Sequence, residues 1–161
     1  MNYSSINKFD DKNGDGARLV LFVSGCPHKC FNCFNKSTWG YLSGDPFSKE
    51  IEQDFFDYFE ENKEFLSGIS LLGGEPLAPR NLSKTSEIMR KFKDTYSHLG
   101  KDIWVWSGYT LEELKQNPDQ CSVLPLIDTL IDGKYVDELR DPELKHRGSS
   151  NQRILKNGID F

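Results

Sequence analysis

The stretch RLVLFVSGCPHKCFNCF, residues 18–34, decides the fold and the chemistry of this chain. Its first part, Arg18 to Val23, is short and rich in Val, Leu and Phe, which predicts a buried β-strand. Ser24-Gly25 then turns the chain off the strand. In parallel α/β folds, ligands bind at the loops that follow the strands, so the next residues are candidate ligands. These are the three cysteines Cys26, Cys30 and Cys33.

The cysteines have the spacing CxxxCxxC, which offers three thiolates and no fourth. A cubane iron–sulfur cluster contains four irons, so this triplet leaves one iron without a protein ligand. An open metal position is where a small molecule binds and reacts. Cys121 stands alone in another stretch, and we expect it to be a half-buried small hydrophobe rather than a fourth ligand.

The composition indicates a single globular domain over residues 1–161. Hydrophobic residues make up 37% and aromatic residues 12% of the sequence, which is enough for a packed core. The net charge is -5 and the cations are scattered, so we expect no nucleic-acid partner. No apolar run approaches the roughly 20 residues of a membrane helix, and the N-terminus has no signal-peptide pattern. We therefore predict a cytoplasmic protein without a membrane partner, and a reducing cytosol favours metal binding over disulfides.

Three further apolar runs predict buried strands over residues 68–72, 102–106 and 127–131, and residues 152–155 form a candidate edge strand. Helical patterns lie between them. Ser48 caps a predicted helix that runs to about Asn62, a second helix spans about 83–98, and a third opens at Thr110, which pairs with Glu113 in a capping box. This alternation predicts parallel strands joined by right-handed crossovers, with the helices on the outer face.

A complete eight-fold barrel needs about 250 residues, and this chain has 161. The predicted fold is therefore α/β, an incomplete (partial) parallel β/α barrel of four to five strands. We expect Trp104 and Trp106 in the third of these strands to point to opposite faces and to serve in packing. The C-terminal segment 137–161 is polar, and we expect residues 137–150 to form a loop.

Polar residues follow each predicted parallel strand at its carboxyl end, where the loops of such a fold build one active site. Glycines let the backbone approach a ligand closely, and the carboxylate of Glu75 and nearby backbone carbonyls can accept hydrogen bonds from an ammonium group. Alone, such a turn is typical of ordinary strand exits. The four exits are the cysteine loop 24–39, Gly73-Gly74-Glu75-Pro76, Ser107-Gly108-Tyr109 and Asp132-Gly133-Lys134.

These residues resemble a known superfamily. Cys26-x3-Cys30-x2-Cys33 followed by Phe34 looks like the radical S-adenosylmethionine (radical SAM) signature, and Gly73-Gly74-Glu75-Pro76 resembles the motif for the methionyl amino group. The similarity extends from about Phe9 to Leu155 and reaches one subgroup, the activating proteins of anaerobic (class III) ribonucleotide reductase. The stretches that carry this closer resemblance are residues 25–39, WVWSGY at 104–109, IDGKY at 131–135 and RGSSNQR at 147–153.

The resemblance implies cofactors, a mechanism and partners. Cys26, Cys30 and Cys33 hold a [4Fe-4S] cluster, and S-adenosyl-L-methionine chelates its fourth iron. Reductive cleavage of that sulfonium gives a 5'-deoxyadenosyl radical, which abstracts hydrogen from a glycine of the reductase large subunit and generates a glycyl radical. The implied protein is a radical SAM glycyl-radical-activating oxidoreductase. Its implied partners are the large subunit of anaerobic ribonucleoside-triphosphate reductase and an external low-potential electron donor.

The resemblance also implies roles for residues outside the cysteines. Gly73, Gly74 and Glu75 are expected at the methionyl ammonium, and Phe34 is expected near the adenine or packed beneath the loop. Ser107 contacts the methionyl carboxylate or ribose, or else caps its own turn. Asp132 and Lys134 are expected on the substrate and radical path, the alternative being a surface ion pair. Arg147, Asn151, Gln152 and Arg153 match the subgroup motif, and cofactor contact, partner docking and folding of the last strand all stay open for them.

Three other functions compete with this one. The first is another radical SAM enzyme that acts on a small molecule, and the motifs after the cysteines argue against it. The second is an electron-transfer iron–sulfur protein, which needs four cysteines at its cluster, and the triplet with the lone Cys121 does not offer them. The third is a non-enzymatic zinc-binding interaction module with His28 or His146 as the fourth ligand. We favour a supporting role for His28, because an additional ligand would close the reactive iron.

Overall fold

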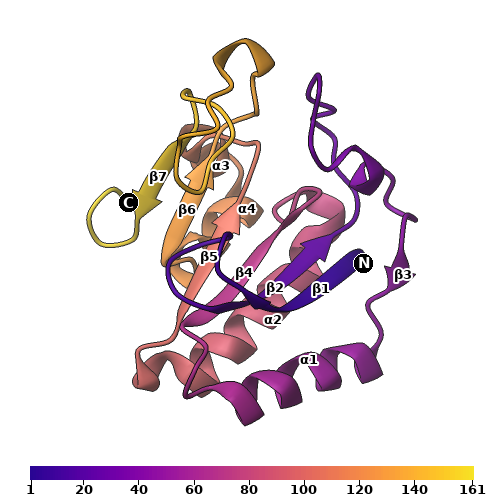
Figure 1. Ribbon diagram of the computed structural model, residues 1–161, viewed down its shortest axis with the longest axis vertical. Coiled ribbons are helices and arrows are strands. Elements are labelled where there is room, and N and C mark those ends of the chain that lie inside the picture. The colour runs from indigo at the N-terminus through magenta and orange to yellow at the C-terminus, as the bar shows by residue number, and fades with distance from the viewer.

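One seven-stranded sheet forms the centre of the structure, a computed structural model that describes all residues, 1–161 (Figure 1). Its strands lie side by side in the order β3-β1-β2-β4-β5-β6-β7. The sheet is open, because the order begins and ends with an edge strand. The strands are β1 (Asn2–Asp10), β2 (Arg18–Val23), β3 (Asp45–Pro46), β4 (Gly68–Gly73), β5 (Asp102–Trp106), β6 (Thr129–Asp132) and β7 (Arg153–Lys156).

The four central strands, β2, β4, β5 and β6, pair in parallel. They lie where the apolar runs predicted them, although β6 begins two residues later than expected, at Thr129. The candidate edge strand is also confirmed, as β7, and it pairs antiparallel with β6. Two antiparallel strands, β1 and β3, were not predicted. Most side chains of β1 are exposed or half-buried, so it lacks the apolar pattern that marks the other strands.

The helices follow the parallel strands in turn, and short 3-10 helices complete the chain. The predicted caps are present: Ser48 accepts a hydrogen bond from the N–H of Ile51, and Thr110 forms both bonds of the capping box with Glu113. No helix is both long and apolar enough to cross a bilayer. The helices are α1 (Lys49–Asn62), α2 (Pro79–Tyr96), α3 (Leu111–Gln116) and α4 (Pro118–Val123), with 3-10 helices at Lys36–Thr38, Ser97–Leu99, Leu124–Leu126 and Asp137–Leu139.

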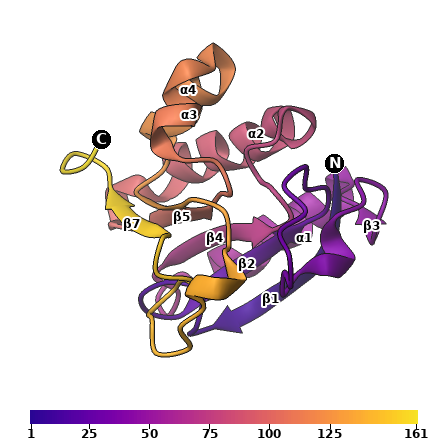
Figure 2. The same ribbon diagram turned by 90° about the horizontal axis from the view of Figure 1, so that it is seen from above.

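All four helices cover the same face of the sheet (Figure 2). The parallel strands succeed one another in a single direction across the sheet, so right-handed crossovers place every connection on one side. Alternate strand residues such as Leu21, Leu71 and Val105 meet the helices and belong to one core of 24 buried residues. Phe59 of α1 and Phe92 of α2 pack edge-to-face in that core, with ring centroids 4.7 Å apart.

The opposite face of the sheet carries larger and more polar side chains. Trp104 and Trp106 lie together there, with ring centroids 5.8 Å apart, so the prediction that they point to opposite faces is wrong. Residues two apart in a strand share a face. Arg18 is fully buried beside Trp104, where its Nε donates to Ser70 Oγ at 2.7 Å and its Nη2 pairs with the Asp102 carboxylate at 2.7 Å. This cluster fills the amino end of the face and leaves the carboxyl end for a site.

Candidate functional site

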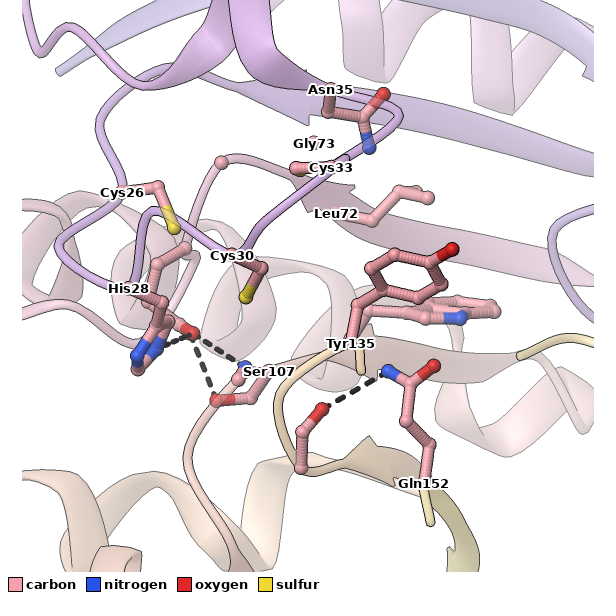
Figure 3. Close-up of a pocket in the computed structure, with 15 residues that line it drawn as sticks. Cys26, His28, Cys30, Cys33, Asn35, Leu72, Gly73, Ser107, Tyr135 and Gln152 are labelled. Carbon is pink, nitrogen blue, oxygen red and sulfur yellow. Dashed lines mark hydrogen bonds and ion pairs between the residues drawn. The ribbon is translucent and has the colours of Figure 1, made fainter. Parts of the chain in front are cut away.

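The carboxyl ends of the four parallel strands surround one cavity of about 140 Å³ that is open to solvent (Figure 3). The convergence predicted from the four strand exits is present, because each exit contributes to its lining. The lining residues are Cys26, His28, Cys30, Cys33, Asn35, Leu72, Gly73, Gly74, Glu75, Trp106, Ser107, Gly108, Gly133, Tyr135 and Gln152.

The cysteine loop is folded tightly against the sheet. Its first residues are tied to its end, because the N–H of Gly25 donates to Thr38 O at 2.7 Å and the N–H of Cys26 donates to Trp39 O at 3.0 Å. Lys29 and Asn32 adopt left-handed backbone conformations, with φ of 48° and 55°. Such conformations are uncommon outside glycine, and they turn the chain sharply between the cysteines. All three thiols are half-buried and line the same cavity.

Two of the thiols are held in an environment that opposes their ionisation. Burial raises the pKa of Cys26 to about 11, against the effect of the backbone N–H groups of His28 and Lys29. Burial and the neighbouring Cys33 also raise the pKa of Cys30, while the backbone N–H of Tyr135 and the charge of Lys134 act the other way. Thiolates rather than thiols bind metals, so ligation there displaces protons and places negative charge beside these N–H groups and Lys134.

The side chain of Glu75 accepts four hydrogen bonds at the edge of the cavity. Its Oε1 accepts hydrogen bonds from Leu77 N–H at 3.0 Å and from Ser107 Oγ at 2.9 Å. Its Oε2 accepts from His28 Nε2 and from Gly108 N–H, both at 2.7 Å. The residue is fully buried. Glu75 therefore joins its own turn, the β5 exit and the cysteine loop in one network.

Two glycines of the predicted motifs are required by close packing. A Cβ on Gly74 would lie 2.6 Å from the carbonyl oxygen of Gly25, because the β4 exit runs against the start of the cysteine loop. A Cβ on Gly108 would lie 2.3 Å from the ring of His28. Both positions exclude a side chain on steric grounds, which is why the Gly73-Gly74-Glu75 and Ser107-Gly108 turns can approach the cysteine loop so closely.

Ser107 lines the cavity as expected, but its hydroxyl is already engaged. It donates to Glu75 Oε1 and accepts the N–H of Tyr109 at 3.1 Å, which is the turn-capping arrangement. Phe34 lies outside the cavity. The residue is 71% exposed, and its ring packs edge-to-face against Tyr135, with Arg140 over it. It lines a second cavity that adjoins the first and shares Cys33, Asn35, Trp106, Tyr135 and Gln152 with it.

The structure does not place Asp132 among the lining residues of the cysteine cavity. Asp132 is buried, accepts the N–H of Leu111 at the start of α3, and pairs with Arg153. Lys134 is exposed and lies near Cys30. Asp132 and Lys134 together line a separate polar cavity on the other side of Gly108 and Gly133.

The four predicted C-terminal residues differ in position. Gln152 lines the cysteine cavity, and its Nε2 donates to Gly133 O at 3.0 Å while its Oε1 accepts the N–H groups of Gly148 and Ser149. Asn151 donates to Lys134 O at 2.8 Å. Arg153 bridges Asp132 and Glu112, so Asn151 and Arg153 hold the β6 exit in place. Arg147 lines the second cavity, donates to Gln152 O and has a buried Nε without a hydrogen-bond partner.

Several residues of the cavity were not predicted as site residues, and two of them left a signal in the sequence. Trp106 follows Trp104 at a spacing of two, which places both rings on the face that leads to the cavity. Tyr135 directly follows the Asp132-Gly133-Lys134 exit. Asn35 belongs to the stretch 25–39 that carries the subgroup resemblance but had no role assigned to it, and Leu72, which precedes the glycine turn, carries no pattern that marks it.

The residues present fit a cluster with an open position better than they fit a single zinc ion. No group of three or more His, Cys, Asp or Glu side chains is close enough to hold one ion, whereas a cubane takes each cysteine on a different iron. Cys121 packs against the hydrophobic core, away from the cavity. The two candidate zinc ligands are engaged elsewhere, because His28 bonds to Glu75 and His146 bonds to Asp15.

Comparison with known proteins agrees with this reading of the site. The family described as "4Fe-4S single cluster domain" matches residues 12–155, which defines the class as an iron–sulfur protein. A protein of Escherichia coli (strain K12) is 46% identical over 154 residues, covering 96% of this chain and 97% of the relative. A protein of Pasteurella multocida (strain Pm70) is 42% identical over 156 residues, covering 97% and 98%. One from Enterobacteria phage T4 is 40% identical over 157 residues, covering 98% and 95%.

Each of these three relatives is named anaerobic ribonucleoside-triphosphate reductase-activating protein. At this identity over nearly the whole length of both chains, the chain belongs to the family of anaerobic ribonucleoside-triphosphate reductase-activating proteins. The resemblance to the activating proteins of anaerobic ribonucleotide reductase is thereby confirmed.

Proposed function

We propose that this chain activates an anaerobic ribonucleoside-triphosphate reductase by radical SAM chemistry. The observation that carries the proposal is the cavity itself, which brings three cysteines without a fourth together with the Gly73-Gly74-Glu75 turn. Membership of the activating-protein family supports the reaction partner. In this proposal the open sheet is a partial barrel of the radical SAM type, and its missing wall admits a protein segment.

Cys26, Cys30 and Cys33 would hold a [4Fe-4S] cluster, and S-adenosyl-L-methionine would bind at the iron that no cysteine reaches. Together, the cluster and S-adenosyl-L-methionine would supply the chemistry, a one-electron reductive cleavage of the sulfonium that leads to hydrogen abstraction from a glycine of the reductase large subunit. Three thiolates place negative charge on the cluster, and Lys134 and the N–H of Tyr135 lie near Cys30 to balance part of it. An external low-potential electron donor completes the reaction.

The protein's own contribution is to bind the cofactor, to orient it and to exclude water from it. Trp106, Leu72 and Tyr135 line the cavity with apolar surface, which suits a cofactor that must be kept from water. Backbone groups of the glycine turn and the amide of Gln152 lie at the same cavity and can orient polar atoms of the cofactor. The adjoining cavity lined by Phe34 and Arg147 offers an approach for the glycine-bearing segment. Asp132 and Lys134 line a polar cavity at the carboxyl end of β6, and we place the far end of the substrate path in this cavity.

The test is anaerobic mixing of the reconstituted chain with the reductase large subunit, a low-potential reductant and S-adenosyl-L-methionine. Electron paramagnetic resonance (EPR) should then detect a glycyl radical on the large subunit. A Cys30→Ala variant is the control and should give no radical, because no spare cysteine lines the cavity. A colourless wild-type protein that holds zinc, or an iron–sulfur protein whose EPR signal does not respond to S-adenosyl-L-methionine, would contradict the proposal.

A further inference from the structure

We propose that His28 and Glu75 form a positioning pair that holds the cysteine loop in the geometry a cluster requires. Glu75 then acts through His28 and the β5 exit, instead of serving as the acceptor for the ammonium group of a bound cofactor. The inference rests on the proposed function for its catalytic consequence. Its structural content, that this one contact sets the cysteine loop, stands on the contacts of the chain alone.

The first observation is that the Glu75 carboxylate has no acceptor capacity left. A carboxylate offers about four lone-pair sites, and four donors occupy them here at 2.7 to 3.0 Å. The side chain is 1% exposed, so no bulk water competes for these sites. An incoming ammonium group would have to displace one of the four donors, and two of these are backbone N–H groups that are fixed by the fold.

The second observation is that His28 connects this carboxylate directly to the cysteine loop. Its ring donates from Nε2 to Glu75, because an ionised carboxylate only accepts. Its backbone belongs to the cysteine loop, two residues after Cys26 and two before Cys30. One residue therefore joins the loop on one side to Glu75 on the other.

The third observation is that the His28 ring has a single place to go. Its side chain is 5% exposed, and the ring packs edge-to-face on Tyr109 with centroids 4.5 Å apart. It also fills the space above Gly108, where a Cβ would come within 2.3 Å of it. Lys29, the next residue, has a left-handed backbone with φ of 48°, a conformation that persists only when its surroundings hold it. The buried ring supplies that hold, and the cysteines on either side follow its position.

The experiment compares two substitutions that differ only in reach. In His28→Gln the side-chain amide nitrogen can stand where Nε2 stands, whereas in His28→Asn it cannot. We expect His28→Gln to keep the wild-type EPR spectrum of the reduced cluster before any S-adenosyl-L-methionine is added. We expect His28→Asn to change that spectrum and to lose iron to a chelator about tenfold faster, the factor that one charge-assisted hydrogen bond supplies. His98→Asn, at an exposed histidine far along the chain, is the matched control and should behave as wild type.

Glu75→Gln tests the other partner of the pair. It keeps the size of the side chain but removes its charge and turns one of the two oxygens into a donor, so in either orientation of the amide two of the four contacts lose their acceptor. The proposal expects the cluster spectrum to change without added cofactor, and a His28→Asn/Glu75→Gln double variant to lose iron no faster than the worse single variant. An ammonium-binding role predicts the opposite: an unchanged cluster spectrum, and weaker S-adenosyl-L-methionine binding only in the Glu75 variant.

Equal behaviour of His28→Gln and His28→Asn, or iron-loss effects that multiply in the double variant, would overturn the positioning pair. Both readouts need only an iron–sulfur cluster on the chain and no reductase. If the wild-type protein forms no glycyl radical, the proposed function is overturned and this inference still stands. If the wild type forms the radical but His28→Gln and His28→Asn behave alike, this inference is overturned and the proposed function still stands.

Discussion

Gly108→Ala is the sharpest test of how the cysteine loop is seated. The added Cβ would lie 2.3 Å from Cδ2 and 2.6 Å from Nε2 of His28. Ordinary van der Waals contact begins near 3.4 Å, so the ring must retreat by roughly 1 Å. The ring cannot do so freely, because Tyr109 packs on it and Glu75 holds its Nε2 at 2.7 Å.

The expected loss of stability follows from these contacts. Overpacking a filled site costs about 1–3 kcal/mol, and losing a hydrogen bond to a charged group costs about 1.5–3 kcal/mol. The His28 ring moves enough to relieve part of the overpacking and to weaken its hydrogen bond to Glu75. We therefore expect the free energy of unfolding to fall by about 2–4 kcal/mol, less than the sum of the two full costs. Urea unfolding of the chain measures it. Gly40→Ala is the matched control, because the only close approach of its Cβ, at 2.6 Å, is to the hydroxyl oxygen of Ser43, which can rotate away.

A double variant decides whether the clash is the cause. His28→Ala removes the ring, so adding it to Gly108→Ala should relieve the overpacking. The destabilisation of the double variant should then fall short of the sum of the single variants by at least about 1 kcal/mol. Gly108→Ala as stable as wild type, or single effects that add within about 0.5 kcal/mol, would refute the reasoning.

The remaining predictions concern the cluster, the amino end of the sheet and the alkaline limit of stability. Cys30→Ala should abolish cluster assembly and S-adenosyl-L-methionine cleavage, seen as loss of visible absorption and of 5'-deoxyadenosine, while far-ultraviolet circular dichroism keeps its wild-type shape. Arg18→Ala should lower the free energy of unfolding by about 3–5 kcal/mol in urea titrations, because it removes a buried charge that bonds to Ser70, Ile69 O and Asp102; a change below about 1 kcal/mol would count against the network. Burial and the nearby Glu60 carboxylate raise the pKa of Tyr96 to about 12 from 10.0, so its folded form keeps its proton longer than the unfolded form does. That contribution to stability is complete below pH 10 and is lost between pH 10 and about 12, so Tyr96→Phe should lose less stability than wild type over this range in denaturant titrations at successive pH values.

The accuracy of the sequence-based predictions depends on how local each signal is. The helix caps at Ser48 and Thr110 are confirmed because a cap is decided by residues within one turn. The second helix begins at Pro79, four residues before the expected start, because proline is compatible with the first turn of a helix and was not used as a start signal. β1 was not predicted, because most of its side chains are exposed or half-buried and its sequence has no regular apolar pattern. It forms a strand by pairing with β2, which the sequence of β1 alone does not indicate.

The sequence by itself determined the class of site and the order of the elements. The cysteine spacing, the glycine turn and the alternation of apolar runs with helical patterns are all local, and each is legible without the fold. Only the tertiary structure decided which polar groups face the cavity and which are used up in holding it together. Asp132 pairs with Arg153 beneath α3, and Glu75 bonds to His28 47 positions away. The sequence shows that a residue carries a carboxylate, but it does not show whether the lone pairs of that carboxylate are free or already accept hydrogen bonds. The donors to these lone pairs come from distant parts of the chain that only packing brings together.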